Sequence, residues 1–251
     1  MSFAATDRPP PVLSLERIHK AFGGVVAIED FTLDVCPGEV VALVGDNGAG
    51  KSTLIKIIAG VHRPTRGRML IDGAESSFRD PSEAQDHGIQ VVYQDLALAD
   101  RQPVYMNVFL GRELITGLMR RLDRRRMIAE TEALLKDLDV RVPSARAAVR
   151  DLSGGQRQGV AIARATHWAA KLILMDEPTA ALGVAETAKV EDIIRGLKAR
   201  SLPILIVSHN LDQVFRLSDR ICVLRRGRQI GIRETASAGK NEIVSMITGL
   251  G

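Results

Sequence analysis

The hydrophobic positions along the chain follow two periods, and each period predicts a different kind of element. Residues 12–18 and 27–35 carry apolar side chains at roughly every second position, which predicts two antiparallel strands near the start of the chain. Continuous apolar runs at 39–44, 172–175 and 203–207 are typical of buried strands. These runs, far apart in the sequence, predict the strands of an α/β core.

Helical spacing marks the segments between these strands. After the third predicted strand, a glycine-rich turn leads into 51–60, whose apolar residues recur at helical spacing. A further strand is predicted at 89–93, followed by helix from about 104 through 138. The last strand signal, 221–232, predicts a hairpin that turns at Gly227. We therefore expect a mostly helical insert that interrupts the α/β core.

Composition places the chain among ordinary globular proteins. Of its 251 residues, 45% are hydrophobic and 25% are charged, which excludes disorder as the dominant state. Cys36 and Cys222 are too few for a disulfide framework and lack the spacing of a zinc site. The formal net charge of +4 is mild and only 4% of the residues are aromatic, so no nucleic-acid partner is expected.

The apolar segments also bear on where the chain works. All apolar runs are far shorter than the about 18 residues needed to span a bilayer, so we expect no membrane crossing. Residues 1–12 hold no basic region followed by an apolar stretch and a cleavage site, which predicts that no secretory signal is present. The expected location is therefore the cytoplasm.

The first chemical motif is GDNGAGKST, Gly45 to Thr53, which satisfies the pattern G-x-x-x-x-G-K-[ST]. Glycines allow backbone N–H groups to surround phosphates, Lys51 reaches the β- and γ-phosphates, and the Ser52 hydroxyl can ligate Mg²⁺. The alternative is a glycine turn before an ordinary helix. The position between a predicted strand and a predicted helix favours phosphate binding.

The second motif is LILMDEP, residues 172–178, an apolar strand that ends in two acids. Adjacent carboxylates at the end of a buried strand are costly unless a cation or a proton-transfer role compensates. Asp176 can hold Mg²⁺ through the hydration shell of the ion, and Glu177 can take a proton from an attacking water. The alternative is an ordinary solvated strand end.

The third motif is LSGGQ, residues 152–156, directly before an apolar helix. Ser153 can cap that helix, while Gly154 and Gly155 expose backbone N–H groups, so the helix start can bind an anion. Taken alone, this string would be only a helix cap.

The ordered set of motifs resembles the ATP-binding cassette ATPases, and the resemblance covers nearly the whole chain. The family's elements appear in its order: a Walker A loop (45–53), a Q-loop glutamine (Gln94), a signature motif (152–156), a Walker B acid with the catalytic glutamate (Asp176 and Glu177) and a switch histidine (His209). Phe22, in HKAFGGVV, resembles the aromatic residue that stacks on adenine in this family.

The resemblance implies an α/β fold, a RecA-like P-loop NTPase core with an N-terminal antiparallel β subdomain and an inserted α-helical subdomain. Its expected segments are the first part of the core with Walker A (1–94), the helical subdomain with the signature motif (95–165), the second part of the core with Walker B and the switch histidine (166–235) and a C-terminal helix (236–251).

The resemblance also implies a role for each site residue. Glu177 would polarise the attacking water, His209 would contact the γ-phosphate, and Gln94 would sense phosphate and Mg²⁺. The implied ligands of Mg²⁺ are Ser52, Gln94 and Asp176. The implied contacts to ATP are Phe22, Gly45, Asp46, Asn47, Gly48, Ala49, Gly50, Lys51, Ser52, Thr53, Ser153, Gly154, Gly155 and Gln156.

A second copy of the chain is the first implied partner. In the family, cassettes pair head to tail, so ATP on the Walker A loop of one copy would be covered by Ser153, Gly154 and Gly155 of the other. One position departs from the family: Gly183 stands where the D-loop commonly has aspartate. The missing carboxylate removes a contact across the expected dimer.

The stretches DEPTAALGVAET, VVYQDLALAD and FLGREL resemble the ATPases of bacterial monosaccharide importers of the ribose, xylose and fructose type. This implies an ATPase that works on the inner face of the cell membrane, with a separate permease and, indirectly, a periplasmic sugar-binding protein. A soluble cassette ATPase of DNA repair or translation stays open, but it would be expected to have a long coiled-coil insertion or tandem cassettes. A P-loop kinase or GTPase has no reason to carry LSGGQ, Gln94 and His209.

Overall fold

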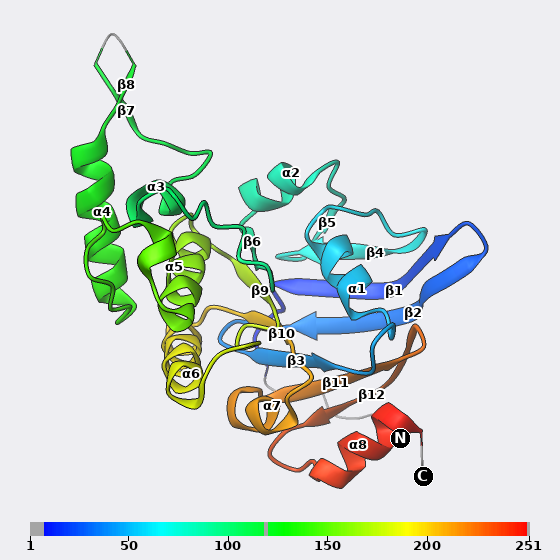
Figure 1. The fold of residues 1–251 in the computed structure, drawn as a ribbon. Helices are drawn as coiled ribbons and strands as arrows, with labels where there is room; N and C mark the ends of the chain where they lie inside the picture. The colour runs from blue at the N-terminus through cyan, green and yellow to red at the C-terminus, as the bar shows by residue number, and fades with distance from the viewer. Residues whose placement is uncertain (1–7, 118–119, 250–251) are drawn as a thin grey trace. The chain divides into compact units, whose positions relative to one another are not determined.

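The computed structural model describes residues 8–117 and 120–249 (Figure 1). The chain divides into two compact units. The first comprises the chain up to Val91, Lys171–Glu177 and the chain from Leu197, and the second comprises Val92–Ala170 and Pro178–Gly196. The segment boundaries expected from the sequence stay a prediction. Residues 1–7 and 250–251, at the two ends of the expected segments, lie outside the described residues. The expectation that residues 1–12 hold no secretory signal therefore falls partly outside them.

A large mixed sheet organises the first unit. In the described part of the chain it has 10 strands in the order β5-β4-β1-β2-β12-β11-β3-β10-β9-β6. The strands are β1 (Leu13–Phe22), β2 (Val25–Val35), β3 (Val40–Val44), β4 (Arg66–Ile71), β5 (Ala74–Ser76), β6 (Ile89–Val92), β9 (Leu172–Asp176), β10 (Ile204–Val207), β11 (Arg220–Arg225) and β12 (Arg228–Glu234).

The centre of the sheet is parallel and buried on both faces. β3 pairs in parallel with β10 and with β11, and β10 pairs in parallel with β9. Along β3, Val41 and Leu43 belong to the main hydrophobic core, whereas Ala42 and Val44 belong to a second cluster. Successive side chains of a strand point to opposite faces, so this continuous apolar run supplies both cores.

Antiparallel pairs flank this parallel centre, as the alternating pattern at the start of the chain predicts for the first two strands, and β12 joins β2 in parallel. β1 pairs with β2 on one side and with β4 on the other. β11 and β12 form the predicted hairpin, in which Arg226 and Gly227 adopt positive φ angles of 48° and 79°. Two successive residues with positive φ form the tight turn whose twist matches that of the flanking strands.

Helices pack on the sheet of the first unit. They are α1 (Lys51–Ile58), α2 (Pro81–Asp86), α7 (Leu211–Leu217) and α8 (Lys240–Thr248). Leu54, Ile57 and Ile58 of α1 are buried in the main core. The amphipathic C-terminal helix α8 lies beside β11 and β12 (Figure 1) and buries Ile243 in the second core. Its predicted helical character is therefore confirmed, and its apolar face packs on the unit that contains it.

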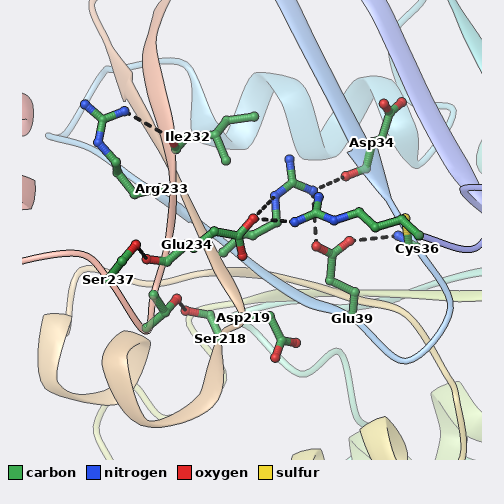
Figure 2. A network of polar contacts seen from close by, with 12 residues as sticks. Asp34, Cys36, Glu39, Ser218, Asp219, Ile232, Arg233, Glu234 and Ser237 are labelled. Carbon is green, nitrogen blue, oxygen red and sulfur yellow. Dashed lines mark hydrogen bonds and ion pairs between the residues drawn. The ribbon is translucent and has the colours of Figure 1, made fainter. Parts of the chain in front are cut away.

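A buried network of ion pairs and hydrogen bonds in this unit centres on Arg220. Arg220, at the start of β11, donates from Nη1 to Oε1 of Glu39 over 3.1 Å and to the carbonyl oxygen of Asp34 over 3.0 Å. Glu39 also accepts the backbone N–H of Cys36 with its Oε2, at 2.9 Å. Figure 2 shows Glu39 between these groups, with Glu234 on the opposite side of the network. The Arg220 and Glu39 side chains are only 9% and 11% exposed.

The second unit is mainly helical. It contains α3 (Val104–Val108), α4 (Arg124–Asp137), the 3₁₀ turn η1 (Val149–Asp151), α5 (Gly154–Thr166) and the short strands β7 (Ile115–Thr116) and β8 (Arg121–Leu122). α3, α4 and α5 pack on one another. α6 (Val184–Ala199) begins in this unit and ends in the first.

The helical segment expected from about 104 through 138 is interrupted. The segment forms α3 and α4, with the hairpin of β7 and β8 between them (Figure 1). Gly111 and Gly117 adopt φ angles of 80° and 70°, a left-handed conformation that a right-handed helix cannot continue through. Asp123 then starts α4 as its N-cap, because its side chain accepts the N–H of Arg126 at 3.0 Å.

The described helices were compared with the length and hydropathy that a membrane-spanning helix needs. None of them combines the length and the apolar character that crossing a membrane requires.

Candidate active site

The phosphate loop, Gly45–Thr53, connects β3 to α1. Gly45 has a φ of 155°, and a Cβ there would lie 2.1 Å from the carbonyl oxygen of Leu224 in β11. At Gly50, with a φ of 111°, a Cβ would lie 2.7 Å from the carbonyl oxygen of Ala27. Glycine is therefore required at both positions, since any side chain would collide with neighbouring backbone.

The turn between β11 and β12 is hydrogen-bonded to the phosphate loop. The N–H of Gly227, at the hairpin turn, donates to the carbonyl oxygen of Ala49 over 2.9 Å. The carbonyl oxygen of Gly227 accepts the N–H of Glu29 in β2, over 2.7 Å. The turn therefore joins the phosphate loop to the antiparallel part of the sheet.

The start of α1 is suited to an anion. Its N-cap, Gly50, forms no side-chain cap, so the first N–H groups of the helix are not satisfied by a capping oxygen. Nζ of Lys51 donates to the carbonyl oxygens of Gly45, at 2.7 Å, and Asp46, at 2.9 Å. Burial lowers the pKa of Lys51, against the opposing effect of Glu177, Asp176 and Asp46. A cation and an uncapped helix start thus meet at one loop.

Two carboxylates stand at the end of β9. Asp176 pairs with Val207 across the parallel strands, and the N–H of Glu177 donates to the carbonyl oxygen of Val207 over 2.9 Å. Glu177 adopts a φ of 52°, a left-handed conformation uncommon for a residue with a side chain. Such conformations gather at functional sites, where the surrounding structure holds them in place.

The charge on Asp176 is costly in this environment. Burial raises the pKa of Asp176, and the negative charge of Glu177 raises it further, while Lys51 and Lys56 lower it. The net pKa lies above the ordinary value of 3.8. A cation bound beside these two acids would remove that cost.

His209 completes the group. It follows β10, and its Nδ1 lies 2.8 Å from Oε1 of Glu177. The Glu177 side chain is 14% exposed and that of His209 is 75% exposed. The loop before α7 is held locally, because the buried Ser208 hydroxyl donates to Gln213 over 3.1 Å and accepts the N–H of Asn210 over 3.1 Å. A half-buried base with an imidazole partner can orient a water for attack on a phosphate.

The oxygen donors present fit Mg²⁺. Ser52 supplies a hydroxyl and Asp176 a carboxylate, both hard oxygen ligands, and the raised pKa of Asp176 marks a carboxylate that a cation would stabilise. Within the described ranges, His, Cys, Asp and Glu side chains do not gather in groups of three or more that could hold a metal ion.

Phe22 presents an aromatic ring at the end of β1. It is 44% exposed, and its ring packs edge to face on His62, with the two centroids 5.1 Å apart. Nζ of Lys20 lies 4.8 Å from the ring centroid. Lys20 and His62 carried no signal in the sequence, because their nearness to Phe22 comes from the fold.

The remaining predicted site residues belong to the second unit. Gln94 is exposed and lies just after β6. Ser153 is the N-cap of α5 and forms a capping box with Gln156: the Ser153 hydroxyl accepts the N–H of Gln156 at 3.3 Å, and the Gln156 side chain accepts the N–H of Ser153 at 2.9 Å. The helix cap proposed from the sequence is therefore confirmed. The structure brings the phosphate loop, Asp176, Glu177 and His209 together within the first unit.

Asp176→Asn is expected to stabilise the chain in the absence of nucleotide. A raised pKa means that folding favours the protonated form, so the parent loses stability as pH rises from the ordinary value of 3.8 through the folded value. The Asn variant lacks that loss and should gain up to about 1 kcal/mol in free energy of unfolding at neutral pH. Urea unfolding from about pH 4 to pH 8 measures the difference, which should widen with pH. Asp192→Asn, at an exposed position, is the control; a difference that does not change with pH would contradict the prediction.

Known proteins are similar to this chain in sequence and in fold. The profile of the ABC transporter family matches residues 28–180. The chain is 46% identical over 237 residues to the xylose/arabinose import ATP-binding protein of Sulfolobus acidocaldarius, covering 94% of each chain. It is 42% identical over 245 residues to the fructose import ATP-binding protein of Rhizobium meliloti, covering 95% of this chain and 94% of that one.

Solved structures agree. The ADP conformation of MJ1267, an ATP-binding cassette of an ABC transporter, superposes with a TM-score of 0.82, at 26% identity and over 96% of both chains. A dimeric structure of MJ0796, a bacterial ABC transporter cassette, superposes with a TM-score of 0.75, at 26% identity, over 89% of this chain and 98% of that one. The α/β cassette fold predicted from the sequence is confirmed, and the chain belongs to the ATP-binding cassette family of ABC transporters.

Proposed function

We propose that this chain is the ATP-hydrolysing subunit of a monosaccharide importer and drives a separate membrane permease. The observation that carries the hydrolytic part is the Glu177–His209 pair, 2.8 Å between Oε1 and Nδ1, in the unit that contains the phosphate loop. The import part is supported by the 46% and 42% identity to ATP-binding proteins of xylose/arabinose and fructose import, each over nearly the full length. A soluble repair or translation ATPase finds no such support.

In the proposed reaction, the phosphate loop binds the triphosphate of ATP. Backbone N–H groups at the start of α1 and the ammonium of Lys51 hold the phosphates, which requires Lys51 to exchange the carbonyl oxygens of Gly45 and Asp46 for phosphate oxygens. Glu177 accepts a proton from the attacking water, and His209 orients Glu177 and approaches the γ-phosphate.

Mg²⁺ would be held by Ser52 and Asp176, and the family resemblance implies Gln94 as a further ligand. When bound, it neutralises charge on the phosphates and on the adjacent carboxylates. Phe22 would receive the adenine on its exposed ring, because stacking of a base on an aromatic side chain is favourable.

A second copy of the chain would complete each site. Ser153, Gly154 and Gly155, at the start of α5, would cover the γ-phosphate of ATP bound to the partner's loop. The dimeric structure of MJ0796, a cassette of the same fold, supports this arrangement. Gly183 leaves this dimer without the carboxylate that the D-loop commonly supplies.

The location follows from the partners. We place the chain in the cytoplasm, on the inner face of the cell membrane, bound to a permease whose periplasmic side receives sugar from a binding protein. No nucleic acid is a partner in this proposal.

The test captures the permease. Glu177→Gln is expected to bind ATP but to hydrolyse it poorly, so it should hold the transport complex in its ATP-bound form. The tagged variant is expressed in the native host, ATP is added, the membranes are solubilised gently, and co-purifying proteins are identified by mass spectrometry. Parent protein without nucleotide is the control.

Recovery of a multi-spanning permease supports the importer, and the associated binding protein is then screened against pentoses and hexoses. Recovery of only ribosomes, nucleic acid or soluble proteins contradicts it and favours the soluble cassette ATPase.

A further inference from the structure

The start of α5 already holds an anion, and that anion is a side chain of the same unit. The N–H of Gly155 donates to Oε1 of Glu186 over 3.1 Å. The Ser153 hydroxyl also lowers the pKa of this carboxyl group. Glu186 is on the first turn of α6, about thirty positions further along the chain.

The two glycines of the signature motif allow this approach. A Cβ on Gly155 would lie 2.9 Å from Cβ of Glu186, and a Cβ on Gly154 would lie 3.0 Å from Cδ2 of Leu182. The stem of Glu186 thus packs directly on the backbone of Gly155. The position of the carboxyl group is fixed by packing as well as by its hydrogen bond to Gly155.

Glu186 joins the N-terminal ends of two helices. It is the third residue of α6, and the backbone N–H of Gly183, the residue before that helix, also lowers the pKa of its carboxyl group. Gly183 has no side chain to cap α6, so Glu186 provides the acidic group there. The positive ends of two helix dipoles therefore meet at this carboxylate.

The groups around Glu186 favour its ionised form. The backbone N–H of Gly155 lowers the pKa of Glu186, and the Ser153 hydroxyl and the backbone N–H of Gly183 lower it further. The group at the start of α5 is therefore a carboxylate, which resembles a phosphate oxygen pair in charge and in acceptor geometry.

We propose that Glu186 is a built-in competitor for the γ-phosphate at the signature motif. This inference rests on the proposed function, in which Ser153 and Gly155 bind the phosphate of ATP on a second copy. A carboxylate and a phosphate cannot share the N–H of Gly155, so Glu186 must leave that donor before the dimer closes. The release sets how much ATP is needed for closure, because only the released form is competent to bind.

A structural role alone gives the opposite expectation. If Glu186 served only to cap α6 and support α5, its removal would loosen the signature motif and weaken phosphate binding. Competition predicts that its removal strengthens phosphate binding. Glu186→Gln keeps the size of the side chain and its acceptor oxygen, so it retains much of the cap while it removes the charge.

The first measurement uses the monomer and sulfate as the probe. The ¹⁵N-labelled full chain is saturated with ADP, which fills the phosphate loop, and the Gly155 amide resonance is followed as sulfate is added. Glu186→Gln and Glu186→Ala should reach half response at about threefold to tenfold less sulfate than the parent. Asp192→Asn removes one negative charge from the same helix, where Asp192 pairs with Arg195 at 2.8 Å, and should match the parent. An equal or weaker response in the Glu186 variants overturns the proposal.

The second measurement uses ATP-dependent dimerisation in the Glu177→Gln background, followed by analytical ultracentrifugation. Adding Glu186→Gln should lower the ATP concentration at half dimerisation by about threefold to tenfold. An unchanged or higher concentration overturns the proposal. If no variant dimerises while sulfate behaves as expected, the dimer of the proposed function fails and the competition at Gly155 stands. If dimers form but sulfate binding is unchanged, the competition at Gly155 fails and the dimer of the proposed function stands.

Discussion

Glu177→Gln is expected to lower the rate of ATP hydrolysis by about 10²–10⁴-fold while ATP binding is retained. The glutamine amide cannot accept the proton of the attacking water, but it keeps the shape of the side chain that His209 contacts at 2.8 Å. The phosphate loop and Lys51 are unchanged, so the affinity for ATP should stay close to that of the parent. Phosphate release at saturating ATP and equilibrium binding of ATP measure the two quantities separately.

Glu242→Gln is the matched control, because Glu242 lies on α8 and pairs with Arg233 at 2.6 Å. It should hydrolyse ATP at the parental rate. A Glu177→Gln variant that retained more than a tenth of the parental rate would show that another group activates the water.

Arg220→Met is expected to lower the free energy of unfolding by about 3–5 kcal/mol. The substitution leaves the carboxylate of Glu39, 11% exposed, without its cationic partner, and it also removes the hydrogen bond to the carbonyl oxygen of Asp34. A buried charge that loses its partner costs more than the pair contributed. Urea unfolding, followed by circular dichroism, measures the change.

The double variant Arg220→Met, Glu39→Gln provides the decisive comparison. Removing the second charge should recover part of the loss, because no unpaired carboxylate remains. Arg228→Met, which breaks an exposed pair with Glu29, should cost less than about 1 kcal/mol. A loss of that small size in Arg220→Met would mean that water replaces the guanidinium.

The sequence predicted the elements whose signals are local. The strand, loop and helix from β3 to α1 could be read from an apolar run, a glycine pattern and helical spacing. The order of the strands could not, since β3 lies between β10 and β11, which come more than 150 positions later. The interruption of the helical segment 104–138 could not be predicted either, because apolar spacing does not show where glycines adopt a left-handed conformation.

In the candidate site, the sequence likewise indicated the residue types but not their contacts. The residue types at 176, 177 and 209 indicated acid and base chemistry, but the 2.8 Å contact of Glu177 with His209 arises from the parallel pairing of β9 and β10. Glu186 carried no sequence signal, because its carboxylate reaches Gly155 only through the packing of α6 on α5. The catalytic, nucleotide and metal roles given to the site residues stay predictions.

The turn at Gly227 limits how this protein can vary. Exposed hairpin turns ordinarily tolerate inserted residues, and loop length there is usually free to drift. Here the N–H of Gly227 holds the carbonyl oxygen of Ala49, and a Cβ on Gly227 would lie 2.9 Å from the carbonyl oxygen of Ala27. An inserted residue would shift the donor away from the phosphate loop. The phosphate loop therefore constrains the length of this turn, whose Gly227 is buried against its neighbours.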